Sequence, residues 1–419
     1  MGITALFTGS TGLQANSTAL DVVGNNLANL NTVGYKSQRT LFQDAVYQSL
    51  GAGSPGTANS GGTNPTQIGF GVTVGQIGTQ FQQGVVTPSG RSLDAAIQGA
   101  GYFVLNNGNQ TQFTRAGSFD IDANGFLVDP STGFLVQRNG LVGDPTPTEP
   151  GFQIPGDNRI KVPFGAGVRG IPTTTVNFQG NISSTIPVGQ SRTTAMQVFD
   201  SLSSAQTLTL TFTKTGSNTY DMAASIPGGT VVQSGTSIQF DTSGILLTPE
   251  TIDLTVTGLP GTNPAGQAIT LDFGTIGQAI GVTQFGGVST VAAVTQDGLA
   301  SGVLTSVAID NNGNLQGQFS NGRTVPLAQL AIAGFNNEGG LLRTGQNYFS
   351  TGPASGEAII GVAREGGRGG IQGASLEGSN VDVAIEFSRL IIAQRGFQVN
   401  ARTVTAANET LQELANIIR

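Results

Sequence analysis

Apolar residues recur with a helical period at both ends of the chain. Near the N-terminus leucine returns every seven positions, and near the C-terminus an apolar side chain does the same. Such spacings, sustained over four heptads or more, predict coiled-coil helices, the second over about 380–417 with Ser379 or Asn380 as its N-cap. The recurring positions are Leu6, Leu13, Leu20 and Leu27 in the first helix, and Val383, Leu390, Phe397, Val404, Leu411 and Ile418, interleaved with a set that begins at Phe387, in the second.

The first of these predicted helices is weak. Gly9, Gly12 and Gly24 fall inside it, and each glycine costs about 1 kcal/mol relative to alanine in a helix interior. We therefore expect this helix to form only against a partner surface. The simplest partner is the C-terminal helix, with neighbouring copies of the chain covering the rest. The alternative is a pair of amphipathic helices packed on an ordinary core.

Asparagines crowd the end of the first predicted helix. The stretch NNLANLNTVGYKSQ, 25–38, contains Asn25, Asn26 and Asn29 before Gly34 allows the chain to turn. We interpret this stretch as the end of a helix that forms only in a polymer. Its leucines would stay on the packed side, and its asparagine side chains would bond to neighbouring copies or cap loose backbone.

The middle of the chain, from about 70 to 375, alternates apolar and polar residues as strands do. In TLTLTFTKTG, 207–216, Leu208, Leu210 and Phe212 fall on one face and threonines on the other. Three segments share the order Asp, two residues, Gly, which suits a type I turn whose glycine takes a positive φ. These predicted β-hairpin turns lie in IDANGFL (121–127), FDTSGIL (240–246) and IDNNGNL (309–315).

A glycine-rich stretch separates the first helix from the strands. Gly51, Gly53 and Gly56 fit the pattern G-x-G-x-x-G. A dinucleotide-binding loop would need a strand before this pattern and a helix after it, and Pro55 opposes that helix. We therefore expect an extended connector here.

The composition removes most catalytic chemistry. The 419 residues include no Cys and no His, which excludes disulfides, zinc–thiolate sites, cysteine nucleophiles and every mechanism that uses histidine. Asp120, Asp122 and Asn124 match the start of an EF-hand loop, but Ser131 stands where that loop needs a bidentate glutamate. No paired-carboxylate site is visible, so we expect no enzymatic activity, metal or cofactor.

Charge and hydropathy restrict the partners. Charged residues make up 10% of the chain and the net charge is −7, which argues against nucleic-acid binding. The N-terminal segment lacks the basic and apolar regions of a secretory signal, and no apolar run approaches the roughly 20 residues that span a membrane. Tyr35, Lys36, Arg39 and Phe42 could form a binding patch, although we favour loop side chains that pack on a neighbouring element.

Four segments of the chain resemble those of the bacterial flagellar axial proteins, the family of rod, hook and related subunits. They occur in that family's order and at its two ends. The middle is similar to the hook members, with an inserted domain that begins near 177–184, although Ser203 stands where the hook pattern usually has glycine. The segments are ALDVVGNNLANLNTVGYKSQR (19–39), LDAAIQGAGYFVL (93–105), FTRAGSFDIDANGFLV (113–128) and LEGSNVDVAIEFSRLIIAQRGFQVNARTV (376–404).

The resemblance implies a mainly β chain with α-helical termini, in which two β-rich domains of barrel or sandwich type are nested. Because the two ends come together, each inner layer would be built from two separate segments. The expected parts are a terminal coiled-coil polymerisation domain (1–32 and 376–419), a connector (33–69 and 371–375), an inner β domain (70–160 and 293–370) and an inserted outer β domain (161–292).

The resemblance also implies a function: a structural subunit of the flagellar hook, exported without a cleaved signal. Copies would form a flexible extracellular tube that transmits torque from rod to filament and encloses the export channel. The implied partners are further copies, the distal rod, the hook cap, the hook–filament junction proteins and the export apparatus. The assembly interface is assigned to the heptad positions above with Asn25, Asn26 and Asn29. The alternatives are a distal rod or junction subunit, a secreted glycoside hydrolase that uses two carboxylates, and a phage-tail or adhesin-like fibre.

Overall fold

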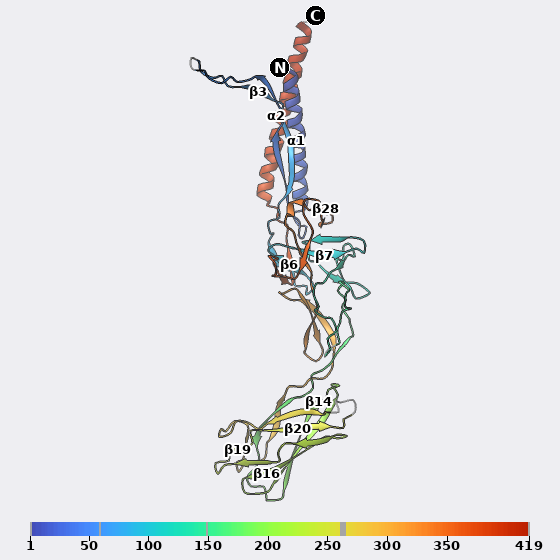
Figure 1. The fold of residues 1–419 in the computed structure, drawn as a ribbon, viewed down its shortest axis with the longest axis vertical. Coiled ribbons are helices and arrows are strands. Elements are labelled where there is room, and N and C mark those ends of the chain that lie inside the picture. The colour runs from blue at the N-terminus through green and yellow to red at the C-terminus, as the bar shows by residue number, and fades with distance from the viewer. Residues whose placement is uncertain (1, 58–59, 148–149, 260–264, 418–419) are drawn as a thin grey trace.

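A helix stands at each end of the chain and β-structure fills the rest, as the two sequence periods predict. The structure, a computed structural model, describes residues 2–57, 60–147, 150–259 and 265–417. Helix α1 spans Gly2–Ala28 and helix α2 spans Val383–Ile417. The two helices lie side by side at one end of an elongated molecule, and the sheets follow along its length (Figure 1). The predicted fold class is confirmed.

The start of α2 differs from the prediction. The helix begins at Val383, and the Oδ1 atom of Asp382 accepts hydrogen bonds from two amides of its first turn, at 2.8 and 3.1 Å. Asp382 therefore caps the helix, because its carboxylate lies beside those free amides. Ser379 and Asn380 precede this cap, and the predicted N-cap is wrong by two or three residues.

Paired strands occupy much of the predicted connector. Strand β1 (Gln38–Asp44) pairs antiparallel with β4 (Val72–Thr79), and both pack beside α1. Strands β2 (Tyr47–Gly51) and β3 (Thr66–Gly69) form a hairpin that projects sideways from the helices (Figure 1). The extended connector predicted for 33–69 is therefore wrong. Glycine and polar residues give this segment no clear alternation of apolar and polar positions, yet its main-chain groups form paired strands.

An inner β unit follows the helices along the molecule (Figure 1). Its largest sheet has the order β28-β29-β8-β7-β11-β10-β9, with β27 on β7 and β30 on β27; a second sheet has the order β12-β24-β25-β26, and β6 pairs with β31 and β5 with β32. Their strands are β5 (Val86–Pro88), β6 (Ala95–Gln98), β7 (Tyr102–Asn106), β8 (Thr111–Thr114), β9 (Asp120–Ile121), β10 (Leu127–Val128), β11 (Leu135–Val136), β12 (Gly167–Val168), β24 (Gly302–Ile309), β25 (Asn314–Phe319), β26 (Thr324–Gln329), β27 (Ile332–Gly334), β28 (Leu342–Gly345), β29 (Tyr348–Ser350), β30 (Ile359–Gly361), β31 (Gly370–Gly373) and β32 (Ser375–Glu377), with the short 3-10 helix η1 (Glu338–Gly340) before β28.

An outer β unit lies at the far end of the molecule (Figure 1). Two sheets, β17-β20-β21-β13-β22 with β23 on β13 and β14-β15-β16-β18-β19, enclose one apolar core. Leu208, Leu210 and Phe212 of β15 are buried there, as their alternation with threonine predicts. The strands are β13 (Thr175–Asn181), β14 (Ser191–Phe199), β15 (Ala205–Lys214), β16 (Thr219–Ser225), β17 (Thr230–Gln233), β18 (Ser237–Phe240), β19 (Leu246–Thr248), β20 (Thr251–Thr257), β21 (Gln267–Asp272), β22 (Val282–Thr283) and β23 (Ala292–Gln296).

The chain passes between the two units at positions that differ from the expected boundaries of 161 and 293. Val162 and Val168 belong to the inner apolar core, so the outward crossing follows Val168. Strand β23 pairs with β13 of the outer unit, so the return crossing lies between Gln296 and Gly302. The expected boundary at 161 therefore assigns Val162 and Val168 to the wrong unit, and the one at 293 does the same for most of β23.

Candidate functional site

Small residues allow α1 and α2 to approach closely. A Cβ atom on Gly12 would lie 2.6 Å from Cγ of Asn400, and one on Gly9 would lie 2.6 Å from Cγ2 of Val404. A Cβ on Gly396 of α2 would lie 2.5 Å from Oδ1 of a side chain on α1. Glycine weakens each helix in isolation, yet here it lets the two backbones pack. The C-terminal helix is thus the partner that the first helix was expected to need.

The contact between the helices follows a different stripe from the predicted heptads. On α1 the buried positions include Ala15 and Asn26, and on α2 they include Ala393 and Ala407. The four α1 leucines flank this stripe and are half-buried. The contact between the two helices lies beside the leucine positions because close packing of the backbones places glycine and alanine along it; the role of the leucines in assembly stays a prediction. On α2 Leu390, Val404 and Leu411 are likewise half-buried beside the stripe.

Large apolar side chains stand exposed on α2. Phe387 is 52% exposed, Ile391 54%, Ile392 68% and Val399 62%. Val383 and Phe397, two of the predicted interface positions, are also exposed, whereas Ile418 lies outside the described residues. We call the exposed apolar side chains Val383, Ile385, Phe387, Ile391, Ile392, Phe397 and Val399 the open face of α2.

The asparagine run ends α1 and ties it to β1. Asn26 is fully buried; its Oδ1 accepts the amide of Gln38 at 2.9 Å and its Nδ2 donates to the carbonyl of Gln38 at 2.8 Å. Its Nδ2 also lies 3.2 Å from Oε2 of Glu386 on α2. Asn25 donates to the hydroxyl of Tyr35, and Asn29 donates back to Asn25. Asn26 thus imitates a strand partner for Gln38, which matches the expectation that these side chains cap loose backbone.

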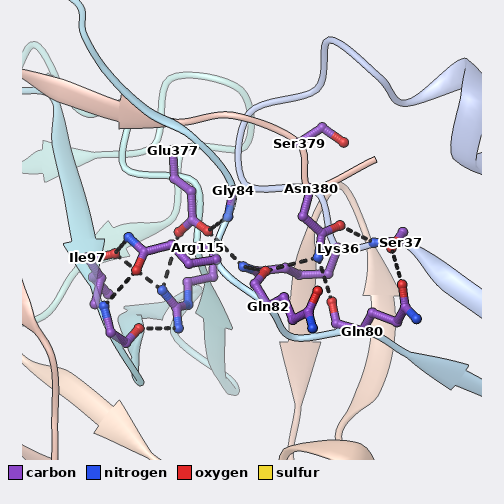
Figure 2. Close-up of polar contacts among 12 residues, drawn as sticks. Lys36, Ser37, Gln80, Gln82, Gly84, Ile97, Arg115, Glu377, Ser379 and Asn380 are labelled. Atoms are coloured by element: carbon purple, nitrogen blue, oxygen red, sulfur yellow. Dashed lines mark hydrogen bonds and ion pairs between the residues drawn. The ribbon is translucent and has the colours of Figure 1, made fainter. Parts of the chain in front are cut away.

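Three buried charges meet where the helices join the inner β unit. Glu377 of β32 is fully buried; its Oε1 lies 2.7 Å from Nζ of Lys36 and its Oε2 lies 3.2 Å from Nη1 of Arg115 (Figure 2). Glu377 also accepts the amide of Gly84 at 2.9 Å, and its own carbonyl accepts the amide of Gly34 at 2.8 Å. We call Lys36, Arg115 and Glu377 the junction cluster.

Neutral acceptors complete the junction cluster. Nζ of Lys36 donates to the carbonyl of Gln82 at 2.8 Å, and Nη2 of Arg115 donates to the carbonyl of Gly99 at 2.7 Å. Burial lowers the pKa of Lys36, and the adjacent Glu377 carboxylate opposes part of that shift. A buried charge is tolerated only when it is paired and hydrogen-bonded, and the cluster meets both conditions for the amine and the carboxylate.

A second set of bonds holds the chain on the other side of Lys36. The side chain of Asn380 accepts the amide of Ser37 at 2.7 Å and donates to the carbonyls of Gln80 at 2.7 Å and Gln82 at 2.9 Å (Figure 2). Asn380 therefore joins the segment before α2 to the start of β1 and the end of β4. This use of Asn380 explains why it is not the cap of α2.

The possible patch at residues 35–42 divides in two. Tyr35 and Lys36 are buried, which confirms that these loop side chains pack on neighbouring elements. Arg39 and Phe42 stay exposed on β1 and line a groove of about 250 Å³ between β1, α1 and α2. Arg389 of α2 also lines this groove. In the part of the chain that the structure describes, no group of three or more acidic side chains could hold a metal ion.

The comparisons with known proteins agree with these features. Family models match under the descriptions "Flagella basal body rod protein" at 6–36, "Flagellar hook protein FlgE/F/G D1 domain" at 96–184, "Flagellar basal body protein FlaE D2 domain" at 171–299 and "Flagellar basal body rod FlgEFG protein C-terminal" at 372–417. The flagellar hook protein FlgE of Treponema pallidum is 35% identical over 99% of both chains. That of Escherichia coli is 33% identical over 97% of this chain and 98% of its own. This chain belongs to the flagellar hook protein family.

As a member of the hook protein family, the chain is a structural subunit of the flagellar hook. The crystal structure of Helicobacter pylori flagellar hook protein FlgE2 covers 68% of this chain and 99% of its own, with 15% identity and a TM-score of 0.42. No helix among the described residues is long and apolar enough to cross a membrane.

The junction cluster joins three separately matched segments of this hook family chain. Lys36 lies in the N-terminal match, Arg115 in the D1 match and Glu377 in the C-terminal match. Sequence reasoning named Lys36 but missed Arg115 and Glu377, which are 79 and 341 positions away from it. The sequence did contain one signal for these two residues. Only 10% of the chain is charged, so a charged residue inside a family motif is a candidate for a specific contact.

Proposed function

We propose that this hook subunit polymerises through its terminal helices into a flexible tube. The tube encloses the export channel, transmits torque from rod to filament and contains no catalytic site. The terminal helices form the innermost layer, and the inner and outer β units form successive outer layers. The observation that carries the proposal is the open face of α2, because a lone soluble chain gains nothing by leaving such side chains in water.

The size of the open face fits an interface between copies. Complete burial of one Phe or Ile side chain stabilises by about 1.5–3 kcal/mol. Ile391, Ile392 and Val399 are each more than half exposed and lie within about two turns of α2. A neighbouring helix pair that covers them would supply the core that α1 and α2 do not complete themselves.

The remaining surface suits copies that move against each other. Serine, threonine, asparagine and glutamine supply most of the polarity, and charged residues make up 10% of the chain. Uncharged polar contacts exchange with water at small net cost, since one hydrogen bond contributes about 0.5–1.5 kcal/mol. A bent tube that rotates needs such exchange between neighbouring subunits.

We further propose that the subunit leaves the cell unfolded, without a cleaved signal, and works outside it. The distal rod, the hook cap, the hook–filament junction proteins and the export apparatus are its proposed partners. Terminal helices that leave apolar side chains uncovered in the single chain suit this route, because those side chains are buried only when copies assemble. The absence of cysteine avoids unwanted cross-links in an oxidising exterior.

The test is assembly of purified protein. Ile391→Gln combined with Ile392→Gln should leave the β units folded and abolish helical tubes in electron micrographs after concentration. Val232→Gln is the matched control, because Val232 is 61% exposed on β17 of the outer unit. Deletion of 385–419 should have the same effect as the double substitution. Normal tubes from either altered helix would refute the proposal.

A further inference from the structure

Four turns of the described chain have the same hydrogen bonds. In each, Oδ1 of an aspartate accepts the amides of the second and fourth residues after it, at 2.7–2.9 Å. The amide of the third residue donates to the carbonyl of the same aspartate. These turns begin at Asp122, Asp200, Asp241 and Asp310. Three of them are the hairpin turns that the Asp–x–x–Gly pattern predicts.

The residue at the third position after the aspartate always has a positive φ. It is glycine in three turns: Gly125 at 84°, Gly244 at 79° and Gly313 at 78°. In the remaining turn it is Ser203, at 68°. Residues other than glycine are uncommon in this region because of their Cβ atom. The presence of serine instead of glycine left the geometry of this turn open in the sequence. Ser203 nevertheless adopts the same geometry as the three glycines, against the conformational preference of serine.

The hydroxyl group of Ser203 makes a bond that no glycine could make. Its Oγ accepts the amide of Gly170 at 2.7 Å, and both residues are buried. This hydroxyl is the partner that the described chain offers to the Gly170 amide. A buried amide without a partner is strongly disfavoured. Loss of the Ser203 hydroxyl would therefore leave the Gly170 amide without its partner, although the hydrogen bonds of the turn itself do not use this hydroxyl.

Gly170 lies on the crossing between the two β units. It follows β12 of the inner unit by two residues, and the next residue, Ile171, exchanges two main-chain bonds of 3.0 and 2.8 Å with Leu299 of the return crossing. A Cβ on Gly170 would lie 1.9 Å from the carbonyl oxygen of Leu299. The two crossings therefore touch at Gly170, and Ser203, between β14 and β15, contacts them from the outer unit.

We propose that the Ser203–Gly170 hydrogen bond restricts the angle between the inner and outer β units. Ser203 is a positioning residue: it holds a turn of the outer unit against the crossing at the point nearest the inner sheet. Further out, the amide of Thr173 donates to the carbonyl of Phe199 at 2.9 Å. That bond fixes the crossing to the outer unit at Thr173, three residues after Gly170. This inference concerns the single chain and does not depend on the proposed assembly.

The experiment uses the full chain, which contains no cysteine and so accepts labels only at introduced sites. Spin labels at Thr324→Cys of the inner unit and Ser225→Cys of the outer unit, both exposed positions, report the distance between units by pulsed electron paramagnetic resonance. Hydrogen exchange of the Gly170 amide reports the bond itself. Ser203→Gly restores the residue used in the other three turns, and Ser203→Ala keeps a Cβ without the hydroxyl.

Both variants should widen the distance distribution at least twofold and speed exchange of the Gly170 amide at least tenfold. Ser203→Gly should fold as well as the parent chain, because glycine relieves the positive φ. Ser243→Ala is the control: Ser243 lies in the turn at Asp241, one position before the equivalent of Ser203, and its side chain is exposed. An unchanged distance width, or an unchanged exchange rate, in Ser203→Gly would overturn the proposal.

Discussion

The helix pair and the outer β unit bury opposite kinds of residue. The outer unit encloses Phe178, Phe212 and Phe273, each at most 2% exposed. The helix pair buries mostly small residues, alanine with Val22 and Val23, and the polar Asn26, while Ile392 stays 68% exposed. The outer unit therefore has its own complete core. The helix pair has packed its backbones closely but leaves its largest apolar side chains for another surface.

This difference predicts where a mutation acts. A change in the outer unit should alter the stability of the single chain, since its core is internal. A change on the open face of α2 should alter assembly and leave the single chain almost unaffected. The hydrophobic contribution is the same per unit area in both places; only the molecule that supplies the second surface differs.

The largest effect is expected from Phe212→Ala. Loss of a buried phenylalanine leaves a cavity and costs about 3–5 kcal/mol, and Phe212 is 1% exposed in the outer core. The free energy of unfolding of the outer unit should fall by that amount in urea titrations. Val232→Ala, at an exposed position of the same unit, should change it by less than about 0.5 kcal/mol. Equal effects of the two changes would contradict a complete outer core.

The next largest effect is expected from Asn26→Ala, which should destabilise the end of α1. It leaves both main-chain groups of Gln38 without their buried partner, at a cost of about 1–3 kcal/mol. Hydrogen exchange of the Gln38 amide should accelerate at least tenfold, with the outer unit unchanged. Asn29→Ala is the control, because Asn29 bonds only within the helix end. An equal effect of Asn29→Ala would show that general helix loss, and not the Gln38 contact, is responsible.

Gly12→Val should separate the helices. The added side chain meets Asn400 at distances below contact, and overpacking of this kind costs about 1–3 kcal/mol. Circular dichroism should show less helix, and tubes should be absent from electron micrographs. Gly24→Ala is the matched change, because a Cβ added there would meet no atom within 4 Å and alanine favours the helix by about 1 kcal/mol. If both substitutions reduced helicity, close packing would not explain the glycines.

Alkaline pH should weaken the outer unit through Tyr220. Burial raises the pKa of its phenol above 10.0, so above pH 10 the unfolded chain releases a proton that the folded unit keeps. The resulting stability is fully present below pH 10 and is lost as pH rises toward the folded pKa, by up to about 1.4 kcal/mol per pH unit. Tyr220→Phe should remove this slope from exchange measurements on β15. If the slope persisted in Tyr220→Phe, another group would be responsible for it. Tyr47→Phe is the control, because Tyr47 is exposed, and it should leave the slope unchanged.

The smallest effect is expected from Ile392→Gln in the unassembled chain. The side chain is already 68% exposed, so its replacement should shift the free energy of unfolding by less than about 0.5 kcal/mol. The concentration needed for tube formation should nevertheless rise at least tenfold. A large loss of monomer stability would mean that the open face is covered within one chain.

Some local features could be read from the sequence because neighbouring residues decide them. The alternation around Phe212 predicts β15, and Asp–x–x–Gly predicts the three turns with glycine at positive φ. The turn at Ser203 could not be settled, since its missing glycine is compatible with several geometries. Residues 38–51 were missed as strands because pairing with distant segments, and not composition, holds them.

The sequence by itself determined the two terminal helices, the β-rich middle and the absence of cysteine and histidine chemistry. Only the tertiary structure decided which stripe joins α1 to α2, because a heptad period groups residues on a face but does not say how closely two backbones approach. It also decided that Lys36, Arg115 and Glu377 share one buried site. Charges 262 and 341 positions apart meet only when the folded chain excludes water between them, and no local pattern carries that information.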